Sequence, residues 1–294
     1  MSLMREVAWC TRLILGAAWL VAGLAPPAAA QSPDPNPGAL TISGATDFTN
    51  AYMFRGIRQE DENLIVWPYF DLGIALHSGD GLLKSVGVNI GTWNSLHRGL
   101  SGSSGPSGKL WYESDFYATF GVGFGHGFAL GTTYTAYTSP NGMFTTVKEI
   151  AVKASADVKG LKPYALMAFE LDTTPGTGQA DAGENAGRYV EVGAAPGYML
   201  SKVALSVPIK VGVSAGNYYE MNTGTSARPA YVDNAFGYFS VAGVATVPVG
   251  GTTRFGAWNV HGGIEFQKLG DTTTELNDGE DTKVIVSGGI GFTY

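Results

Sequence analysis

Residues 203–214 read VALSVPIKVGVS, and this stretch decides the fold class. Every second position carries valine, leucine or isoleucine, and the positions between them carry small or polar residues and one lysine. This alternation is typical of a β-strand with one apolar and one polar face. The same pattern recurs at 64–76 and 115–124. The chain is therefore predicted to be all-β.

The alternating runs predict twelve strands. They are placed at 40–55, 63–77, 83–96, 109–124, 128–137, 147–157, 162–172, 188–199, 204–216, 236–247, 253–267 and 282–294.

The connections between these strands alternate in length. Every connection after an odd-numbered strand is longer than every connection after an even-numbered one. Long loops at one rim and tight turns at the other are typical of a transmembrane antiparallel up-and-down β-barrel, with both termini in the periplasm. A sheet can span a bilayer only when it is closed. A secreted β-sandwich is the alternative, but it gives no reason for this sorting.

The composition agrees with a barrel. The 294 residues include 42 glycines, 12% aromatic residues and only 15% charged residues, with a formal charge of −7. This apolar and aromatic content excludes intrinsic disorder. The acidic balance argues against a nucleic-acid partner.

The N-terminal residues are predicted to be a signal peptide. Arg5 and Arg12 precede an apolar run at 13–25, and small residues follow up to Ala30. This run is too short for a membrane-spanning helix, and the pattern is that of a secretory signal at 1–30 with cleavage after Ala30.

Cleavage would remove Cys10, the one cysteine of the chain, so no disulfide or cysteine metal site is expected. Residues 31–38 are expected to be a polar periplasmic lead-in and residues 39–294 the barrel. The predicted location is the outer membrane of a Gram-negative bacterium, reached through the periplasm. Expected partners are outer-membrane lipid and lipopolysaccharide.

The last strand alternates apolar residues and ends on aromatic ones, Phe292 and Tyr294. Such a C-terminal strand resembles the signal that the barrel-assembly machinery recognises, so that machinery is a further expected partner.

Residues 47–59 read DFTNAYMFRGIRQ. This resembles the first-strand signature of the TorF-type or Gcw_chp family, bacterial porins of unknown role with an F-R-G-[IV]-x-Q element. The matching residues are Phe54, Arg55, Gly56, Ile57 and Gln59; members usually carry serine or threonine where this chain has Arg58. The resemblance implies an outer-membrane barrel and no particular substrate. From the residues themselves, Gly56 is expected to let the chain turn at the rim and Arg55 to pair with a carboxylate inside the barrel. A rim charge that screens solutes is the alternative role for Arg55.

If the apolar faces meet lipid, the opposite faces point inward. The residues thereby predicted to line a pore are Asp47, Arg55, Asp71, Glu113, Asp115, Glu149, Lys153, Glu170, Glu191, Lys210, His261 and Glu265. They include eight acids and three permanent cations. The first interpretation is mutual neutralisation inside a narrow barrel. The second is a set of surplus carboxylates that favours cations in a water-filled pore.

Three functions stay open. The favoured one is a narrow porin-like channel for ions or small hydrophilic solutes with a mild cation preference. The second is a closed structural or interaction barrel that presents outer loops, above all 218–235 and 268–281. The third is a lipid-modifying outer-membrane enzyme, for which Ser95 and His97 share a face, although parity turns that face inward.

No catalytic residue, cofactor or metal site is predicted. The acidic run 60–62 is expected to be solvated, with a divalent cation that bridges it to lipopolysaccharide as an alternative.

Overall fold

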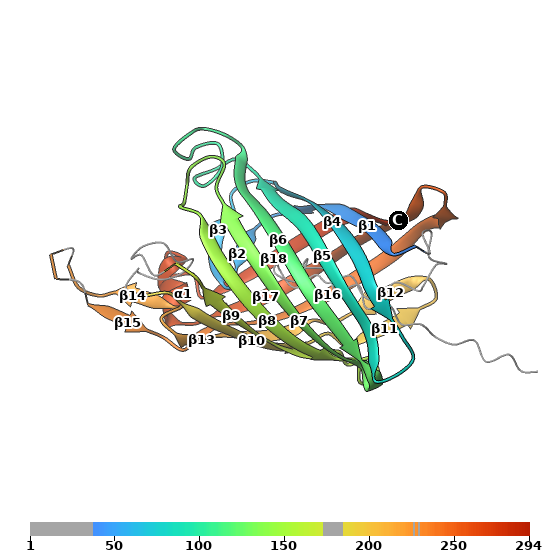
Figure 1. The fold of residues 1–294 in the computed structure, drawn as a ribbon. Coiled ribbons are helices and arrows are strands. Elements are labelled where there is room, and N and C mark those ends of the chain that lie inside the picture. Colours follow the sequence, from blue (N-terminus) through green and yellow to red (C-terminus); the bar gives the residue numbers. More distant parts are fainter. Residues whose placement is uncertain (1–37, 173–184, 226, 229) are drawn as a thin grey trace, which may run out of the picture.

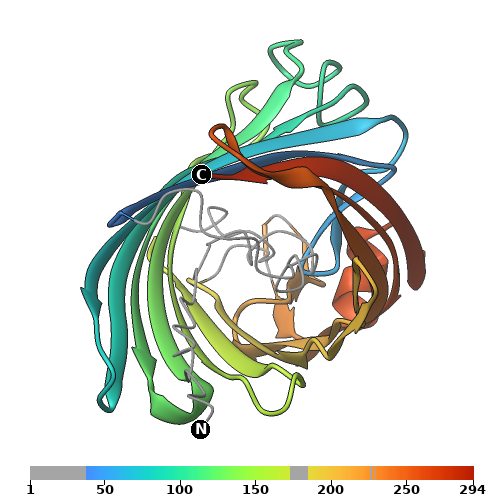
Figure 2. The ribbon, with the colours of Figure 1, turned by 90° about the vertical axis from the view of Figure 1, so that its right-hand side faces the viewer.

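A computed structural model describes residues 38–172 and 185–294, except 226 and 229. The predicted signal peptide and nearly all of the lead-in lie outside the described residues. The chain forms one closed antiparallel barrel, seen along its wall in Figure 1 and from the end that holds the C-terminus in Figure 2. The wall consists of β1 (Leu40–Thr49), β4 (Ile65–Ser78), β5 (Leu83–Leu96), β6 (Trp111–Phe124), β7 (Phe128–Thr138), β8 (Val147–Ala156), β9 (Pro163–Glu170), β10 (Arg188–Ala194), β11 (Gly197–Leu200), β12 (Val203–Ser206), β13 (Ile209–Gly216), β16 (Phe236–Thr253), β17 (Gly256–Leu269) and β18 (Thr282–Thr293).

The barrel has twelve wall strands because two of them are interrupted. β10 continues as β11, and β12 continues as β13. The register runs from Ala194↔Ile209 to Gly197↔Ser206, and a proline lies in each interruption. Proline has no N–H to donate to a sheet, so it breaks the ladder locally. Pairing of β1 with β18 closes the ring, which confirms the twelve-stranded barrel.

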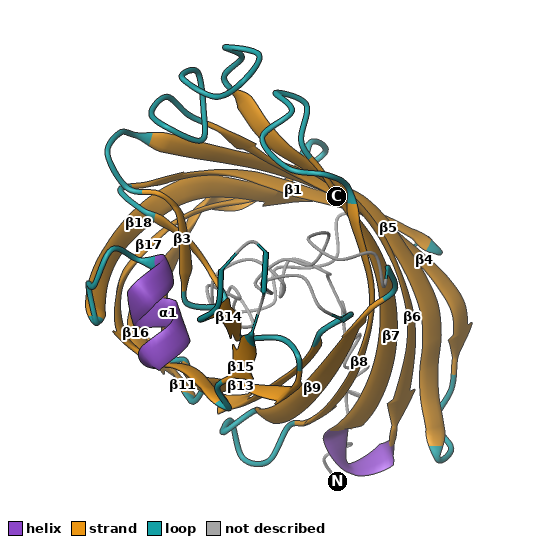
Figure 3. Ribbon diagram, turned by 90° about the vertical axis from the view of Figure 1, so that its left-hand side faces the viewer, coloured by secondary structure: helices purple, strands orange, loops and turns teal. Residues whose placement is uncertain are grey.

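The two ends of the barrel differ as predicted. The turn end carries the short connections and both ends of the barrel chain. The long-connection end carries the other loops, with the hairpin of β2 (Tyr52–Phe54) and β3 (Ile57–Glu60), the hairpin of β14 (Glu220–Asn222) and β15 (Tyr231–Asp233), and helix α1 (Asp271–Leu276). Figure 3 looks onto this end. Within the described ranges, no helix is long and apolar enough to cross a membrane.

Side chains alternate across the wall as the sequence predicts. On β6, Phe116 and Phe120 are about half exposed on the outer surface, while the neighbouring Asp115 and Tyr117 are buried inside. On β13, Ile209 faces outward and Lys210 inward. The outer surface is therefore apolar and the inner surface polar and aromatic, as a barrel in lipid requires.

Inward-facing tyrosines cover inward-facing glycines on neighbouring strands. Gly91 of β5 is paired with Tyr117 of β6, and a Cβ at Gly91 would lie 2.4 Å from the Tyr117 ring. Gly212 of β13 stands in the same relation to Tyr238 of β16, also at 2.4 Å. The rings lie flat across the wall because these positions have no side chain, an arrangement that fixes strand register.

The first strand differs from its prediction. β1 ends at Thr49 rather than at residue 55, and Thr49 pairs with Ile65 of β4. The segment between them, which carries the Phe54–Gln59 motif, leaves the wall and folds inward. The alternation of residues 52–60 belongs to a separate hairpin, because a short alternating run looks the same in either place.

Candidate functional site

The β2–β3 hairpin is the most distinctive feature of the interior. Its two-residue turn consists of Arg55, with φ 49°, and Gly56, with φ 83°. Two successive residues with positive φ are the requirement of a type I′ hairpin turn. The expected turning role of Gly56 is confirmed, but Arg55 belongs to this hairpin and not to the wall.

Both faces of the hairpin are buried. Met53 and Ile57 pack into one apolar cluster with wall residues such as Ala168, and Tyr52 and Phe54 pack into a second with Trp67. The Tyr52 and Trp67 rings meet edge to face at 5.4 Å. Aromatic pairs of this geometry are favourable beyond the area that they bury. The hairpin therefore lies inside the barrel at its long-connection end, packed against the wall (Figure 3).

The side chain of Arg55 is enclosed at the tip of the hairpin. It makes a bidentate ion pair with Glu149 of β8, at 2.7 and 2.9 Å, and bonds the Tyr218 hydroxyl at 3.0 Å. Its guanidinium lies 4.1 Å from the Tyr189 ring centre. The side chains of the pair are only 4% and 1% exposed. Charge-assisted bidentate pairs and cation–π contacts are both strong when water is excluded. The predicted pairing of Arg55 with an interior carboxylate is confirmed.

Two other long connections hold the backbone of the turn. The Tyr219 hydroxyl donates to the carbonyl of Arg55 at 2.8 Å. The Asn277 side chain donates to the carbonyl of Gly56 at 2.8 Å and accepts from the amide of Arg58 at 2.7 Å. The loops expected to form an outer contact surface thus contribute inward contacts as well.

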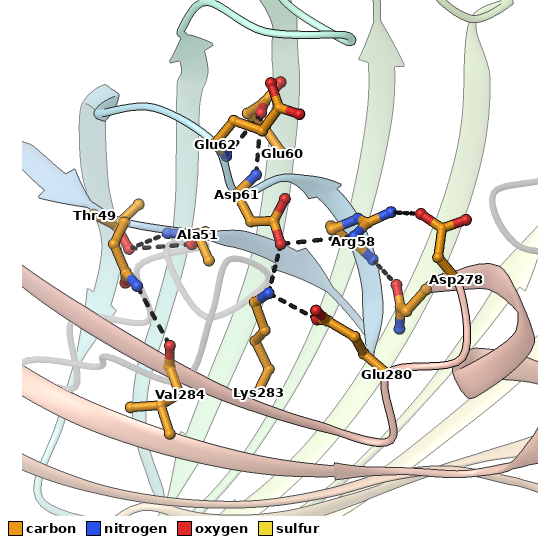
Figure 4. Close-up of polar contacts among 12 residues, drawn as sticks. Thr49, Ala51, Arg58, Glu60, Asp61, Glu62, Asp278, Glu280, Lys283 and Val284 are labelled. Carbon is orange, nitrogen blue, oxygen red and sulfur yellow. Dashed lines mark hydrogen bonds and ion pairs between the residues drawn. The ribbon is translucent and has the colours of Figure 1, made fainter.

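Figure 4 shows the base of the hairpin, where Asp61 lies between two cations. Asp61 accepts from Lys283 of β18 at 2.5 Å and lies 3.7 Å from Arg58. Lys283 also pairs with Glu280 at 2.9 Å, and Arg58 pairs with Asp278. The expectation that residues 60–62 are a solvated acidic run is therefore wrong for Asp61, because the nearby Arg58 and Lys283 of a distant strand meet it.

Glu60, unlike Asp61, is buried, and it ends a chain of hydrogen bonds. Ser101 donates to Glu60 Oε2 at 3.1 Å, and His97 Nε2 lies 3.0 Å from the Ser101 hydroxyl. Since Ser101 gives its single proton to Glu60, His97 must donate from Nε2. Its Nδ1 then accepts from Ser95 at 3.0 Å, which in turn accepts from Trp67 at 3.1 Å. Burial lowers the pKa of His97 to about 4, against the opposing effect of Glu60.

Nearer the turn end, Glu191 of β10 collects three hydroxyl donors. Tyr164, Tyr189 and Tyr238 donate to it at 2.6, 2.7 and 2.7 Å. Two lysines flank this group: Lys153 lies 4.4 Å from the centre of the Tyr164 ring, and Lys210 lies 5.6 Å from that of Tyr238. The structure thus brings Lys153, Glu191 and Lys210 together.

Asp47 and His261 meet across a glycine. Asp47 of β1 and His261 of β17 are both paired with Gly289 of β18, and their side chains lie 2.7 Å apart above it. Asp71 is held by neutral donors, Asn89 at 2.7 Å and Tyr117 at 2.8 Å. Asp47 and His261 thus form a group, whereas Asp71 contacts none of the other residues that were predicted to line a pore.

Glu113 and Asp115 are consecutive inward positions of β6. Tyr52 of the hairpin donates to Glu113 at 2.7 Å, and Oδ1 of Asp115 is buried with no hydrogen-bond partner within the described residues. Glu265 accepts from Ser240 at 2.6 Å, and Glu170 accepts from the amide of Gly187 at 2.8 Å. All twelve predicted residues thus face the interior, eleven from the wall and Arg55 from the hairpin.

The residues considered for catalysis or metal binding form no open site. Ser95 is fully buried and His97 is 3% exposed, with their polar atoms engaged in the chain to Glu60. In the part of the chain that the structure describes, no three His, Cys, Asp or Glu residues are placed to hold a metal ion.

The contacts that dock the hairpin were not predicted from the sequence. Glu60, Ser101, Tyr218, Tyr219 and Asn277 all come from connections, where period-two alternation gives no orientation. One local signal was present: Gly56, because glycine is favoured at the second position of a two-residue hairpin turn.

The chain resembles known proteins only in the course of its backbone. No family model and no curated protein matches it, so the family resemblance of the motif stays a prediction. Among solved structures, the outer membrane phospholipase A from Escherichia coli is 11% identical, with a TM-score of 0.45 over 86% of this chain and 92% of that one.

Two further solved structures are as distant. The translocator domain of the autotransporter NalP from Neisseria meningitidis is 13% identical, with a TM-score of 0.41 over 88% and 89% of the two chains. The KdgM porin is 6% identical, with a TM-score of 0.40 over 86% and 99%. Likeness at this level concerns the course of the strands and carries no argument about function.

Proposed function

We propose that this chain is a narrow channel of the bacterial outer membrane for ions or small hydrophilic solutes. The carrying observation is the polar inner face of the wall, which includes Glu149 beside the hairpin, Asp71 in the middle of β4, and the pair of Asp47 and His261. This face lies opposite an apolar outer surface. Twelve strands give an interior wider than the eight-stranded barrels that side chains fill.

A mild cation preference is part of the proposal. The interior set contains eight acids and three permanent cations. Arg55 neutralises Glu149, and the two lysines flank Glu191. Asp71 and Glu265, in contrast, accept hydrogen bonds from neutral donors within the described residues. Carboxylates of this kind along a water-filled path favour cations.

Single-channel recording of refolded residues 31–294 in a planar bilayer with a salt gradient tests the proposal. We expect discrete openings and a reversal potential whose sign shows that cations pass more readily than anions. Asp71→Asn should reduce that potential, and Asp80→Asn, in an exposed turn, is the matched control. The channel would be refuted if the inserted protein passed no current, and if a variant whose hairpin is released from the interior passed none either.

The docked hairpin favours one second candidate, a closed barrel that acts through its outer loops. Such a barrel would insert, migrate in a heat-modifiable manner on gels and pass no current in any variant. The search would then turn to partners of the loops.

A further inference from the structure

We propose that the β2–β3 hairpin is a hinged gate over the barrel interior, and that the ion pair between Arg55 and Glu149 keeps it shut. The inference rests on the proposed channel function and adds its regulation.

The hairpin can move without opening the wall. β2 and β3 form a two-stranded sheet of their own, separate from the wall sheet. The wall is already continuous beneath them, because Thr49 of β1 pairs directly with Ile65 of β4. The hairpin is thus an insertion whose two ends meet at adjacent wall positions. Swinging it outward breaks none of the wall ladder, which must remain closed in a bilayer.

The base and the tip of the hairpin are held in different ways. At the base, Asp61 is tied to Lys283 of the wall strand β18, which provides a fixed hinge. At the tip, the charged contact with the wall is Arg55 to Glu149. The backbone contacts of the tip come from Tyr219 and Asn277, which belong to other connections at the same end. Movement therefore requires release of the tip and of the bond from Tyr52 to Glu113 of β6, and it leaves the hinge intact.

A buried ion pair at the tip suits a contact that opens and closes better than an apolar pair would. A buried ion pair often stabilises no more than apolar side chains of the same volume, since both charges lose their hydration. When the hairpin swings out, Arg55 and Glu149 regain water, whereas an apolar pair at this position would add to the apolar surface that the hairpin exposes. The pair thus adds little to the free energy that holds the hairpin docked, which comes from the apolar contacts of its two faces, and a ligand or field that favours the undocked state shifts the population.

Thiol labelling measures the movement independently of conduction. Met53 on β2 is 3% exposed, so a cysteine placed there is protected while the hairpin is docked. In Met53→Cys protein, we expect Glu149→Gln to accelerate labelling by a membrane-impermeant maleimide by about tenfold or more, because Arg55 loses its partner. The matched control is Glu265→Gln, another buried acid, which bonds Ser240 and not the hairpin. Equal rates in all three proteins would overturn the gate.

A reversible disulfide between the hairpin and the wall tests whether movement of the hairpin controls conduction. A Cβ at Gly56 would lie 3.0 Å from Cβ of Tyr238 on β16, so cysteines at both positions are within reach of a disulfide after a small adjustment. The Gly56→Cys/Tyr238→Cys protein is its own control, since the same molecules are recorded oxidised and reduced.

We expect the oxidised form to stay closed and the reduced form to open. Equal currents in both forms would overturn the gate and leave the channel standing. If the reduced protein and the Glu149→Gln protein are both silent although labelling is accelerated, the channel function fails, and the gate over it fails with it.

Discussion

The buried pair of Arg55 and Glu149 makes a quantitative prediction about stability. Arg55→Met removes the charge but keeps a flexible apolar side chain against the Tyr189 ring, and Glu149→Gln keeps the shape of the acid. Each change leaves the partner charged in a site where the two side chains are only 4% and 1% exposed. Removal of one partner from such a pair costs about 3–5 kcal/mol.

The double variant should cost far less than the sum of the two. With both charges gone, no unpaired ion stays buried, and coupling within one contact reaches about 2–3 kcal/mol. Reversible unfolding in lipid vesicles, followed by tryptophan fluorescence, measures the four free energies of unfolding. Trp67 and Trp93 flank the hairpin and report its environment.

Two results would refute this reasoning. Single changes that each cost less than about 1 kcal/mol would mean that water reaches the pair, as at a surface ion pair. Additive costs would mean that Arg55 and Glu149 act on stability independently. Asp281 pairs with Lys268 on the exposed surface, so Asp281→Asn is the comparison for an ion pair that contributes little to the free energy of unfolding.

Two further predictions concern pH and packing. Because the pKa of His97 is lowered from 6.5 to about 4, the unfolded chain binds a proton before the folded one does, and stability should fall by up to about 3 kcal/mol as pH drops from 6.5 to 4. NMR titration of the ring should give the midpoint near pH 4, and a midpoint near 6.5 would contradict the buried chain to Glu60. Gly91→Ala should destabilise the barrel by about 1–3 kcal/mol, since the new methyl meets the Tyr117 ring, as thermal unfolding would measure. Gly243→Ala, which meets nothing within 4 Å, should be nearly neutral, and equal effects of the two would argue against the close ring contact.

The wall could be predicted from the sequence because lipid and interior impose opposite demands on alternate residues. Residues such as Ile209 and Lys210 reveal their faces without any knowledge of neighbours. Eleven of the twelve residues that parity turned inward do face the interior from the wall. The alternation of connection lengths then fixed the up-and-down topology.

The hairpin and its contacts could not be predicted in this way. Tyr52 and Phe54 alternate like wall residues, yet both are buried inside the barrel. Their position depends on contacts with residues far away in sequence, such as Tyr112 with its ring 6.3 Å from that of Tyr52. Local pattern carries no information about which distant side chains meet. The interior partner of Arg55 was expected as a type of residue, and only the fold identifies it as Glu149.

The glycine–tyrosine contacts of the wall give the unusual composition a meaning. Some of its glycines and tyrosines belong together, because a ring that lies over the neighbouring strand needs an empty position there, as Tyr117 needs Gly91 and Tyr238 needs Gly212. The unit of design is thus a pair and not a residue. A larger residue in place of the glycine is tolerated only when the tyrosine becomes smaller. In related chains, the two paired positions should therefore change together.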